Sequence, residues 1–145
     1  MSNKEKHIKI LILCTGNSCR SQMAQGFLQS YDSSIEVHSA GTYPAAKVNP
    51  RAVKVMKEAG IDISHHTPRH VDTYLMEEWD YVITVCDHAN ETCPLFMGKV
   101  KNRLHIGFED PVAITGTDDY VLNEYRRIRD LIKAEFLRFY NKEIK

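Results

Sequence analysis

The chain has 145 residues, 43% hydrophobic and 26% charged, a composition typical of one globular domain, and we expect a single domain over 1–145. Its 19 basic and 19 acidic side chains cancel, which disfavours the basic footprint of a nucleic-acid-binding protein. The chain contains no apolar run long enough for a membrane span, and its polar start leads into a predicted strand without an export signal. We therefore expect a cytoplasmic protein, without membrane or nucleic-acid partners, in which permanent disulfides are disfavoured.

Strand and helix patterns alternate along the chain. The expected elements are a strand over 7–13, a helix over 19–31, a strand over 35–39, a helix from Asn49-Pro50 to Gly60, a short helix over 71–78, strands over 81–85 and 102–108, and a long helix that Thr117 caps. This alternation predicts an α/β fold, with an open parallel sheet of about four strands and helices on both faces.

Three predicted strands lead directly into side chains that can do chemistry. The first leads into Cys14, the third into Cys86 and the last into Asp110. In open α/β sheets, functional sites lie outside the carboxyl ends of the strands. Sequence order alone therefore places these three residues on one rim.

The loop after the first strand is the most informative segment. Backbone N–H groups of such a loop and the positive end of the next helix attract an anion. The same field favours a thiolate, so we expect Cys14 to have a lowered pKa and to act as a nucleophile. Arg20 would hold two oxygens of the anion with its planar fork, and Asn17 suits a left-handed backbone. The expected oxyanion-binding residues are Thr15, Gly16, Asn17, Ser18, Cys19, Arg20 and Ser21.

Two other interpretations of this loop are weaker. Cys14 as a buried, inert thiol is the first, because free cysteines are often buried. A nucleotide-binding P-loop is disfavoured, because the Gly-Lys-Ser/Thr ending that grips a triphosphate is absent.

The four cysteines form two pairs, Cys14 with Cys19 and Cys86 with Cys93, and their spacing fits structural zinc poorly. If 86–94 forms a short helix, Cys86 and Cys93 are separated by about 10.5 Å of helical rise, whereas a disulfide needs Cα atoms within about 7 Å. Oxidation would then have to unwind that helix, and its weak helix formers permit this. The alternative is two unrelated core thiols.

A family resemblance follows from these residues together. Cys14-x5-Arg20-Ser21 with Asp110-Pro111 resembles the low-molecular-weight protein tyrosine phosphatase superfamily, and Cys86 and Cys93 make the chain similar to its thioredoxin-coupled arsenate reductases. The similarity covers nearly the whole chain, from about Ile8 to the last helix. Further matching segments are Gln22-Met23-Ala24, Ser39-Ala40-Gly41, Asn49-Pro50, Asp62-Ile63-Ser64 and Val85-Cys86.

The resemblance implies a triple-cysteine relay that reduces arsenate to arsenite and serves arsenic detoxification. Cys14 would attack arsenate held by Arg20 and the loop amides, while Asp110 protonates the departing oxygen. Cys86 would attack the adduct and leave a Cys14–Cys86 disulfide, which Cys93 converts to a Cys86–Cys93 disulfide that thioredoxin reduces. Cys19 has no required step. The expected protein is a monomer without cofactor or metal, with weak phosphatase activity.

At one group of positions the chain departs from the pattern of the family that it resembles. Some reductases of this branch bind potassium behind the loop, at positions that match Asn17, Gln25, Ser39 and Arg69 here. Two of these four ligands are lost, one with reversal of charge, so we expect little effect of potassium and hypothesise that the Arg69 guanidinium replaces the ion. The nearby histidines 65, 66 and 70 are interpreted as surface or site-bordering residues rather than as a metal site.

Two alternative functions stay open at this point. A small tyrosine phosphatase would use the same Cys14, Arg20 and Asp110, but it would leave Cys86 and Cys93 idle. Val112-Ala113 also stand where such phosphatases usually place aromatic residues after their Asp-Pro. The second alternative is a non-enzymatic, thiol-based module that binds arsenite or a metal.

Overall fold

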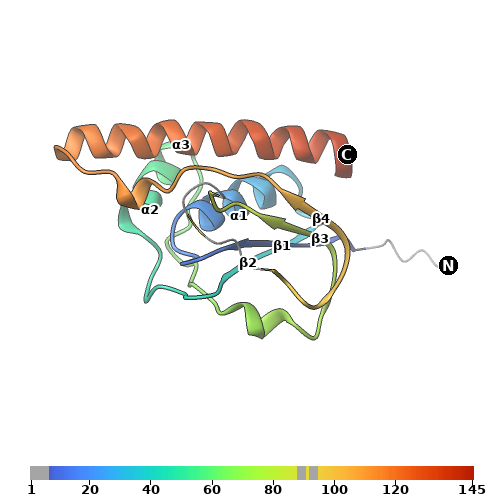
Figure 1. Cartoon of the computed structure of the whole chain (residues 1–145). Helices are drawn as coiled ribbons and strands as arrows, with labels where there is room; N and C mark the ends of the chain where they lie inside the picture. Colours follow the sequence, from blue (N-terminus) through green and yellow to red (C-terminus); the bar gives the residue numbers. More distant parts are fainter. Residues whose placement is uncertain (1–6, 88–90, 92–94) are drawn as a thin grey trace.

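The computed structural model describes residues 7–87, 91 and 95–145. Within them lie strands β1 (Lys9–Cys14), β2 (Glu36–Gly41), β3 (Glu78–Thr84) and β4 (Lys99–His105), helices α1 (Arg20–Tyr31), α2 (Pro50–Glu58) and α3 (Asp118–Phe139), the short 3₁₀ helices η1 (Val71–Tyr74) and η2 (Pro111–Ala113), and a π-helical end η3 (Tyr140–Ile144). Figure 1 shows the α-helices stacked on one face of the sheet and η1 below the other. The predicted α/β class is confirmed, with helices on both faces, although the long ones share one face.

The described residues form a sheet of four parallel strands, as predicted, and the strand order is β2-β1-β3-β4. The central strand β1 is buried on both sides, which is why its sequence is a continuous apolar run. Leu13 pairs with Ala40 on one side and with Thr84 on the other. The carboxyl ends of β1, β2 and β3 therefore meet at one edge of the sheet.

Two strand boundaries differ from the sequence-based expectation. β3 begins at Glu78, which pairs with Lys99, so the β3–β4 ladder starts before the apolar residues do. β4 is an edge strand with exposed polar side chains, and such a strand gives little apolar signal. Beyond β4, the backbone N–H groups of Ile106 and Phe108 still donate to Thr84 (2.9 Å) and Val85 (3.1 Å). These bonds keep the segment that leads to Asp110 beside the end of β3.

The long helices cover the first face with apolar side chains that recur at helical spacing. In α3 the buried side chains are Val121, Tyr125, Ile128, Ile132, Phe136 and Phe139. The Thr117 hydroxyl caps this helix by accepting from the Tyr120 N–H (3.1 Å). Asn49 caps α2, with its side-chain oxygen accepting from the Arg51 N–H (2.8 Å), and Gly60 follows the end of α2 with a positive φ of 85°. Each cap is the residue that the sequence indicated.

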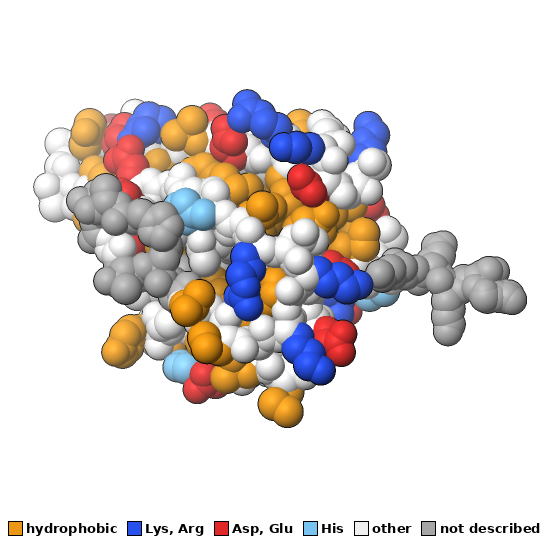
Figure 2. Space-filling view, turned by 45° about the vertical axis from the view of Figure 1, so that its right-hand side comes forward, with side chains coloured by type: hydrophobic (Ala, Val, Ile, Leu, Met, Phe, Trp, Pro, Cys, Tyr) orange, Lys and Arg blue, Asp and Glu red, His pale blue; other side chains and the backbone are white. Residues whose placement is uncertain are grey.

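The second face packs a smaller apolar cluster of Leu11, Leu13, Ala40, Tyr74, Trp79, Val82 and Phe96. On the surface, basic and acidic side chains are intermingled, as Figure 2 shows for one side of the molecule. Among the helices that the structure describes, none is both long and apolar enough to cross a bilayer.

Candidate active site

The candidate site is a cavity of about 250 Å³ at the carboxyl edge of the sheet. Its lining consists of the seven residues Cys14 to Arg20 together with Glu91, Asp110 and Val112. Cys14 is the last residue of β1 and Arg20 is the first of α1. The structure thus brings Cys14 and Asp110 to one cavity, as the order of strand ends predicted, and Arg20 reaches the same cavity from the start of α1.

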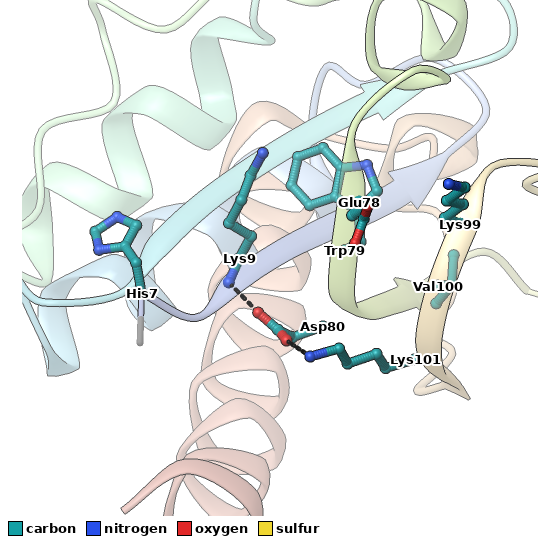
Figure 3. A pocket seen from close by; sticks show the side chains of 8 residues that line it. All are labelled: His7, Lys9, Glu78, Trp79, Asp80, Lys99, Val100 and Lys101. Atoms are coloured by element: carbon teal, nitrogen blue, oxygen red, sulfur yellow. Dashed lines mark hydrogen bonds and ion pairs between the residues drawn. The ribbon is translucent and has the colours of Figure 1, made fainter. Parts of the chain in front are cut away.

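A second hollow lies at the opposite edge, among the amino ends of β1, β3 and β4 (Figure 3). Its charges are largely paired: Asp80 accepts from the Lys9 backbone N–H (2.8 Å) and lies 3.3 Å from the Lys101 ammonium. Cys14 and Asp110 line the first cavity, so the expected chemistry lies at the carboxyl edge.

The loop between β1 and α1 is held in place by hydrogen bonds that its carbonyl groups accept. The backbone N–H groups of Tyr43, Ala45 and Asn49 donate to the carbonyls of residues 15, 16 and 18, at 2.9, 2.9 and 2.8 Å. The Gln22 side chain donates to the carbonyl of residue 17 (3.0 Å). In a planar trans peptide the N–H points away from the C=O, so the N–H groups of residues 16 to 19 face away from these partners. Cys19 makes no side-chain capping bond to α1, so its side chain does not compete with an anion at that helix end.

Asn17 fixes the conformation of this loop through its backbone angle and its side-chain hydrogen bonds. It has a φ of 51°, the left-handed conformation that the sequence suggested for it. Its buried side-chain amide donates to the hydroxyls of Ser21 and Ser39, both at 2.8 Å, and its oxygen accepts from the Arg69 backbone N–H (2.9 Å). The Ser21 hydroxyl thus accepts from Asn17, which fixes the loop from behind.

Gly41, at the end of β2, allows this loop to pass close to the sheet. A Cβ atom there would lie 2.3 Å from the Thr15 carbonyl oxygen and 3.1 Å from the Asn17 nitrogen, both of them backbone atoms that cannot swing aside. The loop and the sheet therefore fit only with glycine at this position.

Gly41→Ala is therefore expected to displace the loop, lowering the free energy of unfolding by about 1–3 kcal/mol, as overpacking does. Urea titration followed by circular dichroism measures this. Gly16→Ala is the matched stability control in the same loop, because a Cβ there meets nothing nearer than 3.8 Å. Equal stability loss in the two variants would contradict the steric argument.

The residues that match potassium ligands form a network of neutral groups. The Ser39 hydroxyl donates to the Gln25 side-chain oxygen (2.6 Å), and Gln25 donates to the Val37 carbonyl (3.4 Å). Arg69 is exposed, and the contact it makes with Asn17 is through its backbone N–H. The hypothesis that the Arg69 guanidinium replaces the ion therefore needs correction, because a backbone amide and Gln25 already satisfy Asn17 and Ser39.

Potassium is accordingly expected to have no specific effect, because a cation site needs several unoccupied oxygen ligands and gains from negative charge. The melting temperature should be the same in potassium and sodium chloride at equal ionic strength, which holds general screening constant. A potassium-specific rise would show that the ion displaces these hydrogen bonds.

Gln22 and His66 support the loop, although the sequence did not single out Gln22. Gln22 is fully buried, and its side-chain oxygen lies 2.9 Å from the His66 ring nitrogen Nδ1. Burial lowers the pKa of His66, which favours the neutral ring. His66 thus contacts the loop through Gln22, while His70 accepts from the Asp72 N–H at the start of η1. In the described ranges no group of three or more His, Cys, Asp or Glu is arranged to hold a metal.

The pKa of Cys14 is the main departure from the sequence-based expectation. We expected it to be lowered, whereas it is raised to about 11. Burial is the largest cause, since the residue is 3% exposed. Arg20 and a backbone hydrogen bond at Thr15 lower the pKa, but the carboxylates of Glu91 and Asp110 raise it. In this state of the molecule Cys14 is therefore a thiol, which burial and the two carboxylates favour over the thiolate.

Arg20 and Asp110 lie beside each other in the lining of the cavity. Arg20 is 4% exposed, and its guanidinium donates to the Phe108 carbonyl (3.1 Å) and lies 3.5 Å from the Asp110 carboxylate. The other Asp110 oxygen accepts from the Val112 N–H (3.0 Å), which caps η2. Asp110 thus has a fixed backbone partner on one side and the anion site on the other, a position suited to an acid that protonates a departing oxygen.

Glu91 is the site residue that sequence reasoning missed. Its carboxylate forms a two-pronged ion pair with Arg20 and accepts from the Thr15 hydroxyl (2.9 Å) and the Asp87 backbone N–H (2.8 Å). A glutamate in a polar segment normally faces solvent, and only its place between Cys86 and Cys93 could have drawn attention to it.

Cys86 lies at the end of β3, fully buried and disulfide-bonded, whereas Cys14 and Cys19 are free thiols. The Val85 N–H donates to the Leu13 carbonyl (3.0 Å), so the register brings the end of β3 alongside Cys14. Neither Cys86 nor Asp87 is helical. Cys93 and most of the predicted helix over 86–94 lie outside the described residues.

Known proteins are similar to this chain along nearly their whole length. The low molecular weight phosphotyrosine protein phosphatase family matches residues 9–145. Arsenate reductases of Halalkalibacterium halodurans and Bacillus subtilis are 48% and 45% identical over 131 residues, which cover 90% of this chain and 93% of each relative.

Solved structures give the same result for the fold. A structure of an arsenate reductase in its phosphate-binding state has a TM-score of 0.78 at 29% identity, covering 93% of this chain and 98% of that one. A tyrosine phosphatase of Erwinia amylovora has a TM-score of 0.72 at 16% identity, which shows the shared fold alone. With the match over residues 9–145 and relatives nearly half identical, the chain belongs to the low molecular weight phosphotyrosine protein phosphatase family.

Proposed function

We propose that this protein reduces arsenate to arsenite through Cys14, Cys86 and Cys93, with thioredoxin as the final reductant. The observation that carries the proposal is the redox-active position of Cys86, disulfide-bonded at the strand end beside the Cys14 loop. A phosphatase needs only Cys14, Arg20 and Asp110, so this second thiol is unexplained by hydrolysis.

In the first step, arsenate takes the place between the loop amides and Arg20. The Cys14 thiolate forms a sulfur–arsenic bond, and one arsenate oxygen leaves as water after taking a proton from Asp110. The described geometry supports these roles, because Asp110 and Arg20 are 3.5 Å apart and line the same cavity as Cys14.

In the second step, the Cys86 thiolate attacks the sulfur of Cys14. The sulfur–arsenic bond breaks, its electron pair reduces arsenic from the pentavalent to the trivalent state, and arsenite departs from a Cys14–Cys86 disulfide. Cys93 then attacks Cys86 and releases the Cys14 thiolate. The thioredoxin dithiol supplies two electrons and reduces the Cys86–Cys93 disulfide, which balances the cycle.

Tyrosine phosphatase activity is the second candidate, favoured by the shared Cys14, Arg20 and Asp110. Against a dedicated phosphatase, the mouth of the cavity carries Val112, which is 54% exposed, where an aromatic side chain would hold a phosphotyrosine ring. A non-enzymatic arsenite-binding module is the third. We expect arsenate-dependent oxidation of NADPH in the presence of thioredoxin and thioredoxin reductase, at a rate well above aryl phosphate hydrolysis. Hydrolysis without arsenate reduction would favour the phosphatase, and arsenite binding without turnover would favour the module.

The proposal also covers the setting of the reaction. A thioredoxin-reduced disulfide requires a reducing compartment, so we place the protein in the cytoplasm. We further propose a single domain over 1–145 that acts as a monomer. Size-exclusion chromatography with light scattering tests the monomer, and cell fractionation tests the compartment.

A further inference from the structure

We propose that Glu91 is an internal anion, which occupies the oxyanion site while Cys86 is in its disulfide and excludes the inorganic anion until the disulfide is reduced. The idea rests on the proposed function only in taking arsenate as the natural anion, since the exclusion applies to any tetrahedral oxyanion.

The contacts of Glu91 are those that an oxyanion would make. One oxygen accepts from the Thr15 hydroxyl (2.9 Å) and from Arg20 Nη2 (3.2 Å), and the other is bound to Arg20 Nη1. A two-pronged contact with a guanidinium is how arginine holds phosphate-like anions. The Glu91 side chain is 20% exposed, so most of this carboxylate has left the solvent to enter the site.

Glu91 and an oxyanion cannot share the site. Arg20 is 4% exposed, and its other contacts are with the Phe108 carbonyl and Asp110, so its accessible face is taken. An incoming dianion would also meet two carboxylates, Glu91 and Asp110, around a single guanidinium. Like charges within a few ångströms of one another in a poorly hydrated cavity repel strongly.

The position of Glu91 is tied to the redox-active cysteine. The Asp87 backbone N–H donates to the Glu91 carboxylate (2.8 Å), and the Glu91 N–H donates to the Asp87 carbonyl (2.8 Å). Asp87 directly follows Cys86, which is disulfide-bonded in this state. The carboxylate is therefore fixed to the backbone next to the bond that reduction breaks.

The same carboxylate disfavours the thiolate form of the nucleophile. Burial is the largest cause of the raised pKa of Cys14, and the charge of Glu91 adds to it against the opposite effect of Arg20. Hydrogen bonds from Arg20, the Asp87 N–H and the Thr15 hydroxyl lower the pKa of Glu91 although its burial would raise it, so it is a carboxylate at neutral pH. Departure of Glu91 would thus open the anion site and favour the Cys14 thiolate together.

The test measures binding of inorganic phosphate, which cannot be reduced, by isothermal titration calorimetry at constant ionic strength. Reduced and oxidised protein are compared, after mass spectrometry has confirmed an intramolecular disulfide at Cys86 in the oxidised sample. We expect the oxidised protein to bind phosphate about tenfold more weakly or worse, a difference of about 1.4 kcal/mol. In Glu91→Gln the phosphate affinities of the reduced and the oxidised protein should agree within about twofold. Because Glu91 is partly exposed, we expect the variant to fold, and thermal melting checks this.

Glu109→Gln is the matched control. It removes one negative charge from the segment that leads to Asp110, but its carboxylate pairs with Arg127 (2.8 Å) and does not line the cavity. This variant should keep the full difference between the redox states. Equal phosphate affinity of the two states in the unmodified protein would overturn the proposal, and so would a difference that persists in Glu91→Gln. Because phosphate binding needs neither arsenate nor thioredoxin, these results stand apart from a failure of the proposed reductase activity.

Discussion

Replacing Cys14 with serine is expected to abolish arsenate reduction and aryl phosphate hydrolysis together, each to less than about 1% of the unmodified protein. The reason is that both reactions begin with the attack of the same sulfur, at the end of β1 and inside the anion-binding loop. A serine hydroxyl at that place is a far weaker nucleophile than a thiolate.

The measurement pairs the thioredoxin-coupled assay with hydrolysis of an aryl phosphate on the same purified variant. The control is internal, since Cys14→Ser leaves Arg20 and the loop amides in place. Its reduced form should still bind inorganic phosphate, which shows that the site is folded. Turnover of a few per cent or more in either assay would remove Cys14 from the role of sole nucleophile.

Replacing Cys86 with serine is expected to separate the two activities. Thioredoxin-coupled turnover should fall below about 1%, because no thiol remains to attack the Cys14 adduct and release arsenite. Hydrolysis of an aryl phosphate should persist, because it requires only Cys14, Arg20 and Asp110. Cys93→Ser should likewise stop multiple turnover while sparing hydrolysis.

A single-turnover experiment without thioredoxin distinguishes the two cysteines. Cys93→Ser should release one arsenite per chain, since Cys14 and Cys86 suffice for the first disulfide, whereas Cys86→Ser should release none. Equal loss of hydrolysis and reduction in these variants would instead show that the second cysteine pair is structural, with Cys86 serving the core in which it is buried.

The parts of the site that depend on strand order were predictable from sequence. Parallel strands bring their carboxyl ends to one edge, and that alone placed Cys14, Cys86 and Asp110 on a common rim. Asn17 was recognisable because few residues other than glycine adopt its positive φ of 51°. The ends of β4 were less predictable, because an exposed edge strand has no apolar alternation to mark them.

The electrostatics of the site was not predictable. The positive end of a helix and a nearby arginine indicated a thiolate at Cys14, but the pattern contained no information on its burial or on a carboxylate that arrives from a distant segment. Glu91 is 76 residues from Thr15 and 71 from Arg20 in the chain. Likewise, the sequence indicated a changed charge at Arg69, but only the fold shows that its backbone N–H makes the contact.

The three backbone donors that hold the loop carbonyls, at Tyr43, Ala45 and Asn49, all come from the connection between β2 and α2. This connection therefore shapes the anion cavity by holding the loop, although it does not line the cavity. The length and the turns of the connection set the curvature of the loop, and that curvature sets the size of the anion that fits. Laboratory selection for a larger or smaller oxyanion should accordingly enrich changes in residues 42–48, leaving every residue that touches the anion as it is.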